Sequence, residues 1–451
     1  MTIMQPRTKS ILYTALIAVC LLFGAFIFVN GRTKVEFPGL MERTGPLAKE
    51  LEWDKTRQRV DQLMTKLEKN PQDTKSMLLL AKEYMQEARV TGNFSYYNTA
   101  SLDLADKVLA LDPTNLDAVC YKAMALLSQH RFAEGRRVAM DGLKMNPYNS
   151  FIYGLLVDAN VEMGDYDEAV RMSDKMNQVR PDLRSYSRVS YLREIFGDPN
   201  GAIEAVNMAV EAGYPGREDT EWARMVLGHL YEDTNRPDLA LEQYNISLSH
   251  YPNYPFALAG IGRIMRYNKD YSKAIEYFES ARDIVSDGSF FAELTDLYRL
   301  NGQPEKAEEC ARATLNAMLA DNAAANRNQN EGHYADYELA NLYLKLGEPD
   351  KAYEHARKEY DRRPQNIDAN ETLAWVLYKQ GKADEAERYA REALRTRSQK
   401  PERLVKMGLI LSVAGHRTDG DPLIDKGMEL KPYMDEELVE TVNDYRERTQ
   451  S

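Results

Sequence analysis

Cysteine is scarce in this chain, which has three cysteines among its 451 residues. Cys20 lies in an apolar run. Cys120 and Cys310 are about five repeats apart on the period described below, too far to bridge within one chain. This scarcity excludes a disulfide framework and a cysteine-based metal cluster. We expect the thiols to be buried and inert.

Motifs for catalysis and cofactor binding are also missing. The six histidines do not pair with one another or with cysteine at the spacing of metal ligands. The sequence contains no GxxxxGK(S/T) phosphate loop and no GxSxG nucleophile turn. Acidic side chains are mixed with Lys and Arg, as is typical of solvated helix faces, and an acid–base pair among them is the remaining alternative. We therefore expect no enzymatic activity, no cofactor and no metal.

Positive charge is in deficit. The chain has 58 Lys and Arg against 70 Asp and Glu, a net charge of −12. An acidic surface repels phosphate backbones, which argues against nucleic acid as the main partner. A local basic patch is still compatible with this balance.

One long apolar run is present. Residues 10–29, SILYTALIAVCLLFGAFIFV, carry no charge, and as a helix they would span ~30 Å, the thickness of a bilayer core. Arg7 and Lys9 precede the run and Arg32 and Lys34 follow it, so positive charge barely distinguishes its two sides. The short tail before it favours a signal anchor. We expect a single-pass membrane protein whose large C-terminal part is on the exported (periplasmic or extracytoplasmic) side.

Two other processing routes are alternatives. Residues 29–31, Val-Asn-Gly, form a tolerable but poor cleavage site, and a cleaved signal would have a shorter apolar region of ~7–15 residues. The residues IAVC that end at Cys20 faintly resemble a lipidation motif, but Val19 fits that motif poorly and the apolar run continues beyond it. A retained anchor is the favoured interpretation.

A fixed period runs through the rest of the sequence. Pro113, Pro147 and Pro181 are separated by 34 and 34 residues. Small residues in the middle of each unit extend the series at spacings of 33 to 45: Gly135, Ala169, Ala202, Ala240, Ala274, Ala307, Ala352, Ala386 and Gly420. A period of this size is the signature of stacked supersecondary units.

Each unit predicts a pair of helices. In residues 368–397, Leu373 and Leu377 share one face of a first helix, and Ala386 lies on the apolar face of a second. Gly381 between them can adopt the positive φ that ends a helix. Proline at the end of a unit stops the second helix. The small residue lies where the two helices approach closely, so the units should stack into a helical solenoid.

The sequence resembles the tetratricopeptide repeat family, from about Trp53 to Pro432. The family pattern of a turn residue followed by aromatic and Ala positions appears as Gly164/Tyr166/Ala169, as Asp270/Tyr271/Ala274/Phe278/Ala281 and as Ala240/Tyr244. The succession of units is similar to the long, membrane-anchored multi-repeat proteins of bacteria. The resemblance implies no particular reaction. It implies a concave groove, lined by the first helix of each pair, that binds peptides or extended protein segments.

This interpretation divides the chain into five parts and about ten repeat units. We expect residues 89–100 and 317–336 to be insertions that project from the edge of the array, as tolerated loops or as partner-contacting flaps. Because each unit should bury itself only against its neighbours, we expect an elongated, rod-like spiral. The parts are a tail (1–9), a transmembrane signal anchor (10–29), a linker (30–45), the repeat solenoid (46–433) and a C-terminal capping helix (434–451).

The resemblance also selects candidate partner-binding residues on the inner face of the first helices. Aromatic and Arg side chains are frequent among them, and these types carry most binding energy at interfaces. Arg263 and Arg266 could form a positive spot for a carboxylate, and packing between units is the alternative role for each aromatic. Glu232, Asp368 and Glu371 occupy equivalent positions. The candidates are Arg184, Tyr191, Glu194, Trp222, His229, Arg263, Arg266, Tyr334, Tyr337, Asn341, Trp375 and Tyr378.

Two functions remain open at this point. The first is a non-enzymatic, membrane-anchored scaffold that gathers protein or peptide partners of an envelope assembly in its groove. The second is a binding module for an extended peptide or glycan captured by aromatic groove residues. The sequence leaves the partner and the oligomeric state undetermined.

Overall fold

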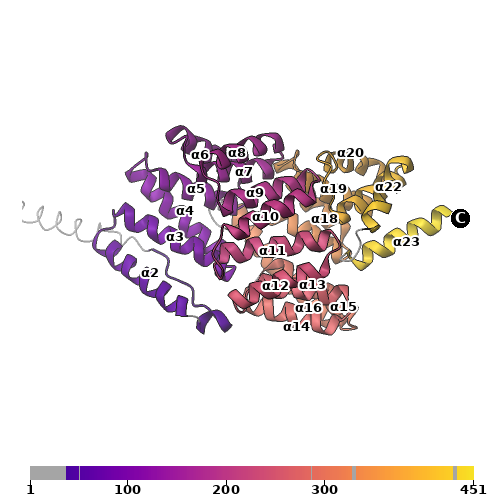
Figure 1. Cartoon of the computed structure of the whole chain (residues 1–451), viewed down its shortest axis with the longest axis horizontal. Coiled ribbons are helices and arrows are strands. Elements are labelled where there is room, and N and C mark those ends of the chain that lie inside the picture. Colours follow the sequence, from indigo (N-terminus) through magenta and orange to yellow (C-terminus); the bar gives the residue numbers. More distant parts are fainter. Residues whose placement is uncertain (1–36, 50, 286, 328–331, 430–433, 451) are drawn as a thin grey trace, which may run out of the picture.

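The computed structural model describes residues 37–49, 51–285, 287–327, 332–429 and 434–450. Within these ranges the protein is all-α (Figure 1), and none of its helices is both long and apolar enough to cross a membrane. The predicted membrane segment, residues 10–29, lies outside the described residues.

The described ranges contain one short 3-10 helix and 22 α-helices. In chain order they are η1 (Gly45–Lys49), α2 (Leu51–Lys69), α3 (Thr74–Thr91), α4 (Phe94–Leu111), α5 (Leu116–Ser128), α6 (Phe132–Met145), α7 (Ser150–Met163), α8 (Tyr166–Val179), α9 (Leu183–Ile195), α10 (Pro199–Glu211), α11 (Glu218–Asp233), α12 (Pro237–His250), α13 (Pro255–Tyr267), α14 (Tyr271–Ile284), α15 (Gly288–Leu300), α16 (Pro304–Arg327), α17 (Asp336–Lys345), α18 (Pro349–Arg362), α19 (Ile367–Lys379), α20 (Ala383–Ala393), α21 (Pro401–Val413), α22 (Arg417–Glu429) and α23 (Glu436–Gln450).

Successive helices pack as pairs, from α3 with α4 to α21 with α22, which gives ten pairs in the described ranges. The helix α2 precedes the first pair and α23 follows the last. The small residues of the periodic series lie where helices meet, since Ala169, Ala202 and Ala240 are fully buried. The all-α solenoid predicted from the period is therefore confirmed.

Local sequence sets the ends of the helices. The Asn149 side chain accepts hydrogen bonds from the backbone N–H groups of Phe151 and Ile152, at 3.0 and 3.3 Å, and so caps the start of α7. Gly164 ends α7 in the left-handed region with φ +78°, which a glycine adopts without a steric cost. Pro199 opens α10 at a position where a backbone N–H has no helical partner.

Residues 37–44, which we call the N-terminal strap, have no regular secondary structure, as expected for the linker. They lie against the first helix pair. Tyr96 Oη donates a hydrogen bond to the Gly39 carbonyl oxygen at 2.7 Å, and the Met41 N–H donates to Tyr97 Oη at 3.0 Å. Tyrosine hydroxyls therefore hold the main chain of the strap.

A buried ion pair fixes the end of the strap. The Arg43 guanidinium contacts the Glu87 carboxylate at 2.5 and 3.0 Å, and both side chains are fully buried. Arg43 also contacts Glu52 at 2.9 Å and lies 4.8 Å from the centre of the Trp53 ring. Because removing one partner would leave a buried charge uncompensated, this pair ties the strap firmly to α3.

The two predicted insertions differ from expectation. Residues 89–100 do not project as a loop, because α3 continues to Thr91 and α4 begins at Phe94 after a turn at Gly92. That prediction was wrong, and the additional residues lengthen both helices instead. The second insertion lengthens α16, which runs for 24 residues to Arg327. The extended part of α16 contacts the first half of the chain, since Ser95 Oγ donates a hydrogen bond to the Asp321 carboxylate at 3.1 Å.

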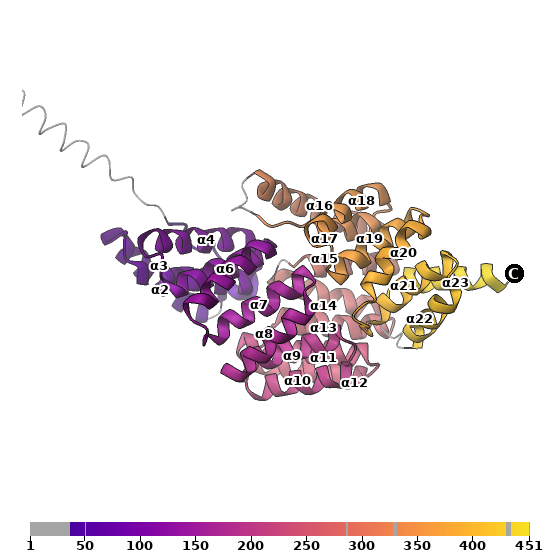
Figure 2. The same ribbon diagram turned by 90° about the horizontal axis from the view of Figure 1, so that it is seen from above.

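The array winds back on itself. Figures 1 and 2 show the first and second halves of the chain packed into one body, and hydrogen bonds from Asn366 and Arg395 in the second half reach the end of α7 in the first half. The prediction that each unit packs only against its neighbours was wrong, and the array is more compact than a rod. The reason is superhelical: small rotations between units accumulate until units far apart in sequence meet.

The main contact between the two turns joins the end of α7 to the start of α19. Asn366 is fully buried, and its Nδ2 group donates hydrogen bonds to the carbonyl oxygens of Val161 and Glu162 at 3.3 and 3.1 Å. The Ile367 N–H donates to Tyr166 Oη at 2.9 Å. We call this set of contacts the inter-turn contact.

Glycine makes the close approach in the inter-turn contact. A Cβ atom added at Gly164 would overlap the carbonyl oxygen of Gln365. Arg395 donates hydrogen bonds to the carbonyl oxygens of both residues, at 2.6 and 2.7 Å, and so bridges the two turns. Gly197 is equally constrained, because its Cβ would overlap the carbonyl oxygen of Arg397.

Further contacts between the turns lie nearer the N-terminus. Leu47 of η1 packs with Ile284 and Val285 in one buried cluster. His130 Nδ1 is 2.9 Å from the carbonyl oxygen of Tyr334. The two turns therefore touch at several points along the array.

We predict that Gly164→Ala destabilises the protein far more than Gly381→Ala. Both glycines end a first helix at nearly the same backbone angle, φ +78° and +76°, but Gly381 has nothing within 4 Å of an added Cβ. The backbone cost of ~1–2 kcal/mol is common to both variants. The additional loss at Gly164, about 2 kcal/mol, reports the inter-turn contact. Urea unfolding of the full-length protein measures the difference, and equal losses would contradict the assignment.

Candidate functional site

A two-lobed cleft lies between the turns, and we call it the inter-turn cleft. Its two lobes share the lining residues Tyr337 and Asp368, so they adjoin each other. The first, of about 270 Å³, we call the lysine lobe, and the second, of about 510 Å³, the aromatic lobe. The lysine lobe is lined by residues of α11, α17, α19 and α21, and the aromatic lobe by residues of α5, α7, α9, α17 and α19 together with turn residues such as His130 and Arg363.

Ion pairs organise the wall of the lysine lobe. Arg403, which is 4% exposed, contacts Glu371 at 2.6 Å and also pairs with Asp368. Lys406 contacts Glu402 at 3.2 Å. Although burial alone would raise the pKa of Glu371, Arg403 and Lys406 together hold it below the usual value. Lysine and arginine in this lobe are thus already compensated by carboxylates of the chain.

The aromatic lobe has an apolar wall and a charged rim. Phe151 and Leu155 of α7 contribute to the apolar wall. On the rim, Arg188 donates to the Asp158 carboxylate at 2.5 and 2.8 Å. Glu162 pairs with Arg363, yet burial outweighs this partner and raises the pKa of Glu162 to about 7.

Two further carboxylates in the cleft differ from the rest. Asp233 of the lysine lobe and Glu338 of the aromatic lobe form no ion pair with any described residue. Glu338 Oε2 is buried without a hydrogen-bond partner in the described part of the chain. Burial raises the pKa of Asp233 to about 7, and Lys400 only partly opposes this shift. Burial also raises the pKa of Glu338.

Several predicted groove residues meet at or beside this cleft. Tyr337 lines both lobes. Glu194 contacts Lys400 of the lysine lobe at 3.0 Å. Tyr191 of α9 is 38% exposed and lines neither lobe.

His229 lines neither lobe, but Arg263 and Lys400 lie close enough to influence it. Its Nε2 atom is buried without a hydrogen-bond partner among the described residues. Burial, with help from Arg263 and Lys400, lowers its pKa well below the usual value. A neutral imidazole is therefore present there at physiological pH.

The predicted positive spot at Arg263 and Arg266 does not exist. Arg263 contacts Glu232 at 2.9 and 3.1 Å, so its charge is balanced within the groove. Arg266 contacts Glu293 at 2.7 Å and pairs with Glu436 of α23. The sequence could not indicate these pairs because their partners come from different helices, one of them 170 positions away.

The other predicted residues make local or capping contacts. The Trp375 and Tyr378 rings stack at 4.9 Å and pack against an apolar cluster that includes Val405 of α21 and Leu438 of α23. Trp222, which is 40% exposed, packs edge-on against Phe256 at 5.1 Å. The remaining positions also have partners within the fold: Arg184 lies over the Phe151 ring, Arg362 lies over the Tyr334 ring, and Asn341 donates to the Tyr337 carbonyl oxygen.

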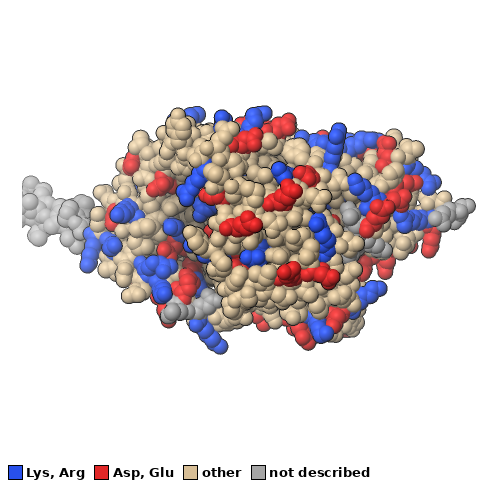
Figure 3. All heavy atoms as spheres, viewed as in Figure 1, with Lys and Arg blue, Asp and Glu red and all other residues tan. Residues whose placement is uncertain are grey.

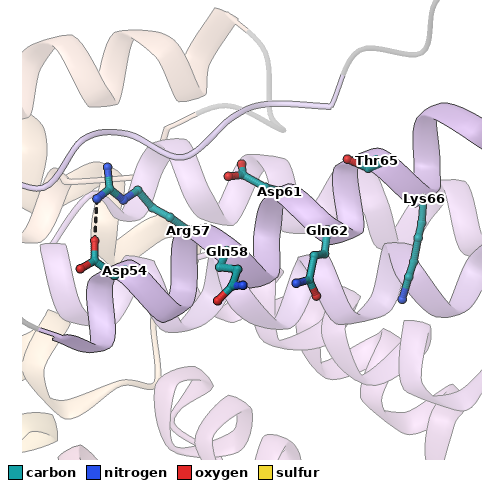
Figure 4. Close-up of a pocket in the computed structure, with 7 residues that line it drawn as sticks. All are labelled: Asp54, Arg57, Gln58, Asp61, Gln62, Thr65 and Lys66. Carbon is teal, nitrogen blue, oxygen red and sulfur yellow. Dashed lines mark hydrogen bonds and ion pairs between the residues drawn. The ribbon is translucent and has the colours of Figure 1, made fainter.

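A second hollow, of about 630 Å³, lies along α2. Figure 4 shows that its side chains all come from one face of this helix, with a single ion pair between Arg57 and Asp54 at 2.7 Å. On the visible face of the molecule, positive and negative side chains are interspersed (Figure 3). The α2 hollow is thus a solvated helix face, whereas the inter-turn cleft gathers residues from distant units.

Sequence reasoning missed most of the cleft. Lys400, Arg403 and Lys406 belong to the last repeat, and Asp158 and Glu162 to α7, which the groove assignment did not reach. The repeat pattern did contain the information needed. Assigning inward-facing positions to the first helix of every unit, and not only of the middle units, would have pointed to these helices. Among the described residues, no three His, Cys, Asp or Glu side chains are grouped to hold a metal ion.

Comparisons with known proteins agree on the type of repeat. The tetratricopeptide repeat family model matches residues 225–289 and 337–402. Over 338 residues the chain is 22% identical to anaphase-promoting complex subunit CDC16 of Saccharomyces cerevisiae, which covers 66% of this chain and 39% of that protein. The chain thus spans about two fifths of the length of this relative.

Three solved structures are similar to this chain at low identity, each with a TM-score below 0.5. The APC/C hetero-tetramer Cut9-Hcn1 gives a TM-score of 0.47 at 19% identity, over 73% of this chain and 60% of that chain. The thermophilic TPR protein TTC0263 of Thermus thermophilus gives 0.36 at 18% identity, over 46% and 98%. The type IV pilus biogenesis factor PilW gives 0.38 at 17% identity, over 46% and 94%.

We predict that Asp233 makes the folded protein less stable as pH rises from 6 to 8. Its pKa in the folded state, about 7, lies above the ordinary value of ~3.9, so between these values the folded state binds more protons than the unfolded state. Stability therefore falls as pH rises through 7. One such group lowers the free energy of unfolding by about 1 kcal/mol between pH 6 and pH 8.

Thermal unfolding of the full-length protein at pH 6, 7 and 8, followed by circular dichroism, measures this effect. Asp233→Asn should remove its share of the pH dependence. The exposed Asp174→Asn on α8 is the matched control and should leave the slope unchanged. A wild-type slope in Asp233→Asn would contradict the prediction.

Proposed function

We propose that this chain, two segments of which match the tetratricopeptide repeat family model, is a non-enzymatic scaffold that binds an extended segment of a partner protein on the inner face of its superhelix. The observation that carries this proposal is the inter-turn cleft, which gathers charged and aromatic side chains from units far apart in the chain. A site of this kind can select a ligand by the shape of the ligand as well as by the positions of its charges. The match to a family of binding repeats supports binding over a reaction.

The dimensions of the cleft favour an extended segment. The aromatic lobe, of about 510 Å³, is in the size range of ligand pockets, and the lysine lobe, of about 270 Å³, is slightly smaller, so the cleft accepts a few side chains rather than a folded domain. Tyr337 lies where the lobes join, so an extended chain that passes it would contact both. Aromatic side chains at such central positions are typical binding hot spots.

We also propose that the scaffold is anchored in a membrane and serves an envelope assembly. The support comes from the sequence, since residues 10–29 are uncharged and long enough to span a bilayer. The N-terminal strap starts at residue 37, so about seven residues separate the end of this run from the folded array. This spacing would hold the array within about 25 Å of the membrane surface.

A free peptide or a glycan is the alternative ligand. Trp222 and Tyr191 favour it, since they are 40% and 38% exposed and present aromatic surface for stacking. An isolated soluble ligand that binds without a protein partner would support this alternative.

We predict that a photocrosslinker on the inner face captures a partner and one on the outer face does not. In the first variant, p-benzoylphenylalanine replaces Tyr337 in the full-length protein in its native membranes. The control variant carries it at Tyr148, which is 82% exposed. Discrete crosslinked species at the first position, absent at the second, are expected, and the reverse pattern would place the partner on the outer surface. Far-ultraviolet circular dichroism of both variants checks that each is folded.

We predict further that a topology reporter fused after Ser451 is active on the exported side. The uncharged run and the short tail before it favour this orientation. Alkaline phosphatase requires export for activity, and a fusion to a cytoplasm-active reporter is the control. Activity of the cytoplasmic reporter alone would overturn the membrane placement and leave the groove proposal standing.

A further inference from the structure

The inter-turn cleft has a surplus of negative charge. Of the described residues that line its two lobes, eight are Asp or Glu and five are Lys or Arg. A bound segment has to complement this charge, because charges in a partly open cleft between two protein walls are screened less by water than charges on a flat surface. A ligand can pair only with those charges that have no partner within the chain.

All five cations of the cleft are already engaged. Their partners lie within the fold, so an anionic ligand would have to displace a carboxylate of the chain to reach any of them. The pairs are Arg188 with Asp158 at 2.5 Å, Lys400 with Glu194 at 3.0 Å, Lys406 with Glu402 at 3.2 Å, Arg403 with Glu371 at 2.6 Å, and Arg363 with Glu162.

Two carboxylates, one in each lobe, are left over. Asp233 and Glu338 have no ion pair with a described residue, and Glu338 Oε2 is buried without a hydrogen-bond partner. Burying a charged group without a partner is costly, and burial raises the pKa of both groups accordingly. A ligand cation at either position would remove that cost and gain a charge-assisted hydrogen bond.

The apolar wall adds a second requirement. Phe151 and Leu155, with Met124 and Leu127 of α5, line the aromatic lobe on the side of the first helices. Lys and Arg carry aliphatic stems that pack on such a surface while the charged end reaches a carboxylate. Arg also stacks on aromatic rings, and Arg184 of this chain already lies 5.9 Å from the Phe151 ring.

We propose that the partner segment in the inter-turn cleft is basic, and that it brings one Lys or Arg to Asp233 and another to Glu338 on either side of Tyr337. This inference rests on the proposed function and specifies the chemistry of its partner. The chain's own net charge of −12 also favours a basic partner by long-range attraction.

A random octapeptide library displayed on phage and selected on the full-length, detergent-solubilised protein tests the inference. Selected peptides should be enriched in Arg and Lys at two positions. The best peptide is then made with citrulline, the neutral analogue of arginine, at those positions. We expect at least tenfold weaker binding of the citrulline peptide in fluorescence anisotropy.

Matched variants locate the charges. Asp233→Asn and Glu338→Gln should each weaken the arginine peptide about tenfold and leave the citrulline peptide nearly unchanged. Asp174→Asn, which removes one exposed carboxylate outside the cleft, should change neither. Equal effects of Asp174→Asn and Asp233→Asn would overturn the inference by showing that net charge alone drives binding.

Crosslinking separates failure of the inference from failure of the proposed function. If selected peptides are uncharged or acidic but still crosslink to the benzoylphenylalanine at position 337, the basic assignment is wrong and the groove proposal stands. If basic peptides bind but crosslink only to the Tyr148 variant, both are overturned, because the binding site then lies on the outer surface.

Discussion

The backbone approach of Gly164 to Gln365 is the constraint on which the rest of this architecture depends. In an array held together by neighbour contacts alone, small errors in the rotation between units add up along the chain, and distant units have no defined separation. Hydrogen bonds from Asn366 and Arg395 across this approach fix two distant units against each other. The distance between these two units determines the shape of the cleft. Its two walls are therefore positioned by contacts between distant units and not by the packing within any one repeat.

The period made most of the fold predictable from the sequence. Ala169, Ala202 and Ala240 recur because two helices approach closely at that point, and this requirement is local to each unit. The helix ends were predictable for the same reason, since Gly164 at a turn acts within a few residues. A prediction that depends on spacing within one unit, or between adjacent units, needs no knowledge of how the whole array curves.

Contacts between the turns could not be predicted in this way. Which units meet depends on the superhelical pitch, a sum of rotations too small to be visible in any single repeat. Arg263 and Arg266 illustrate the consequence: their groove positions were assigned from the repeat pattern, but their carboxylate partners lie on α11, α15 and α23. The prediction of a projecting loop at residues 89–100 was wrong for a different reason. A longer helix and a projecting loop have similar composition when the added residues are polar and small.

Enclosure between two turns also affects the rate at which a bound segment leaves. A segment on an open groove can peel away sideways, whereas one that lies between α7 and α19 has protein on opposite sides. It exits by sliding along the superhelix axis or after the turns separate locally. Residence time would then depend on the strength of the chain's internal contacts as well as on the contacts of the ligand. Mutations at Asn366, which lines neither lobe, would shorten the lifetime of such a complex.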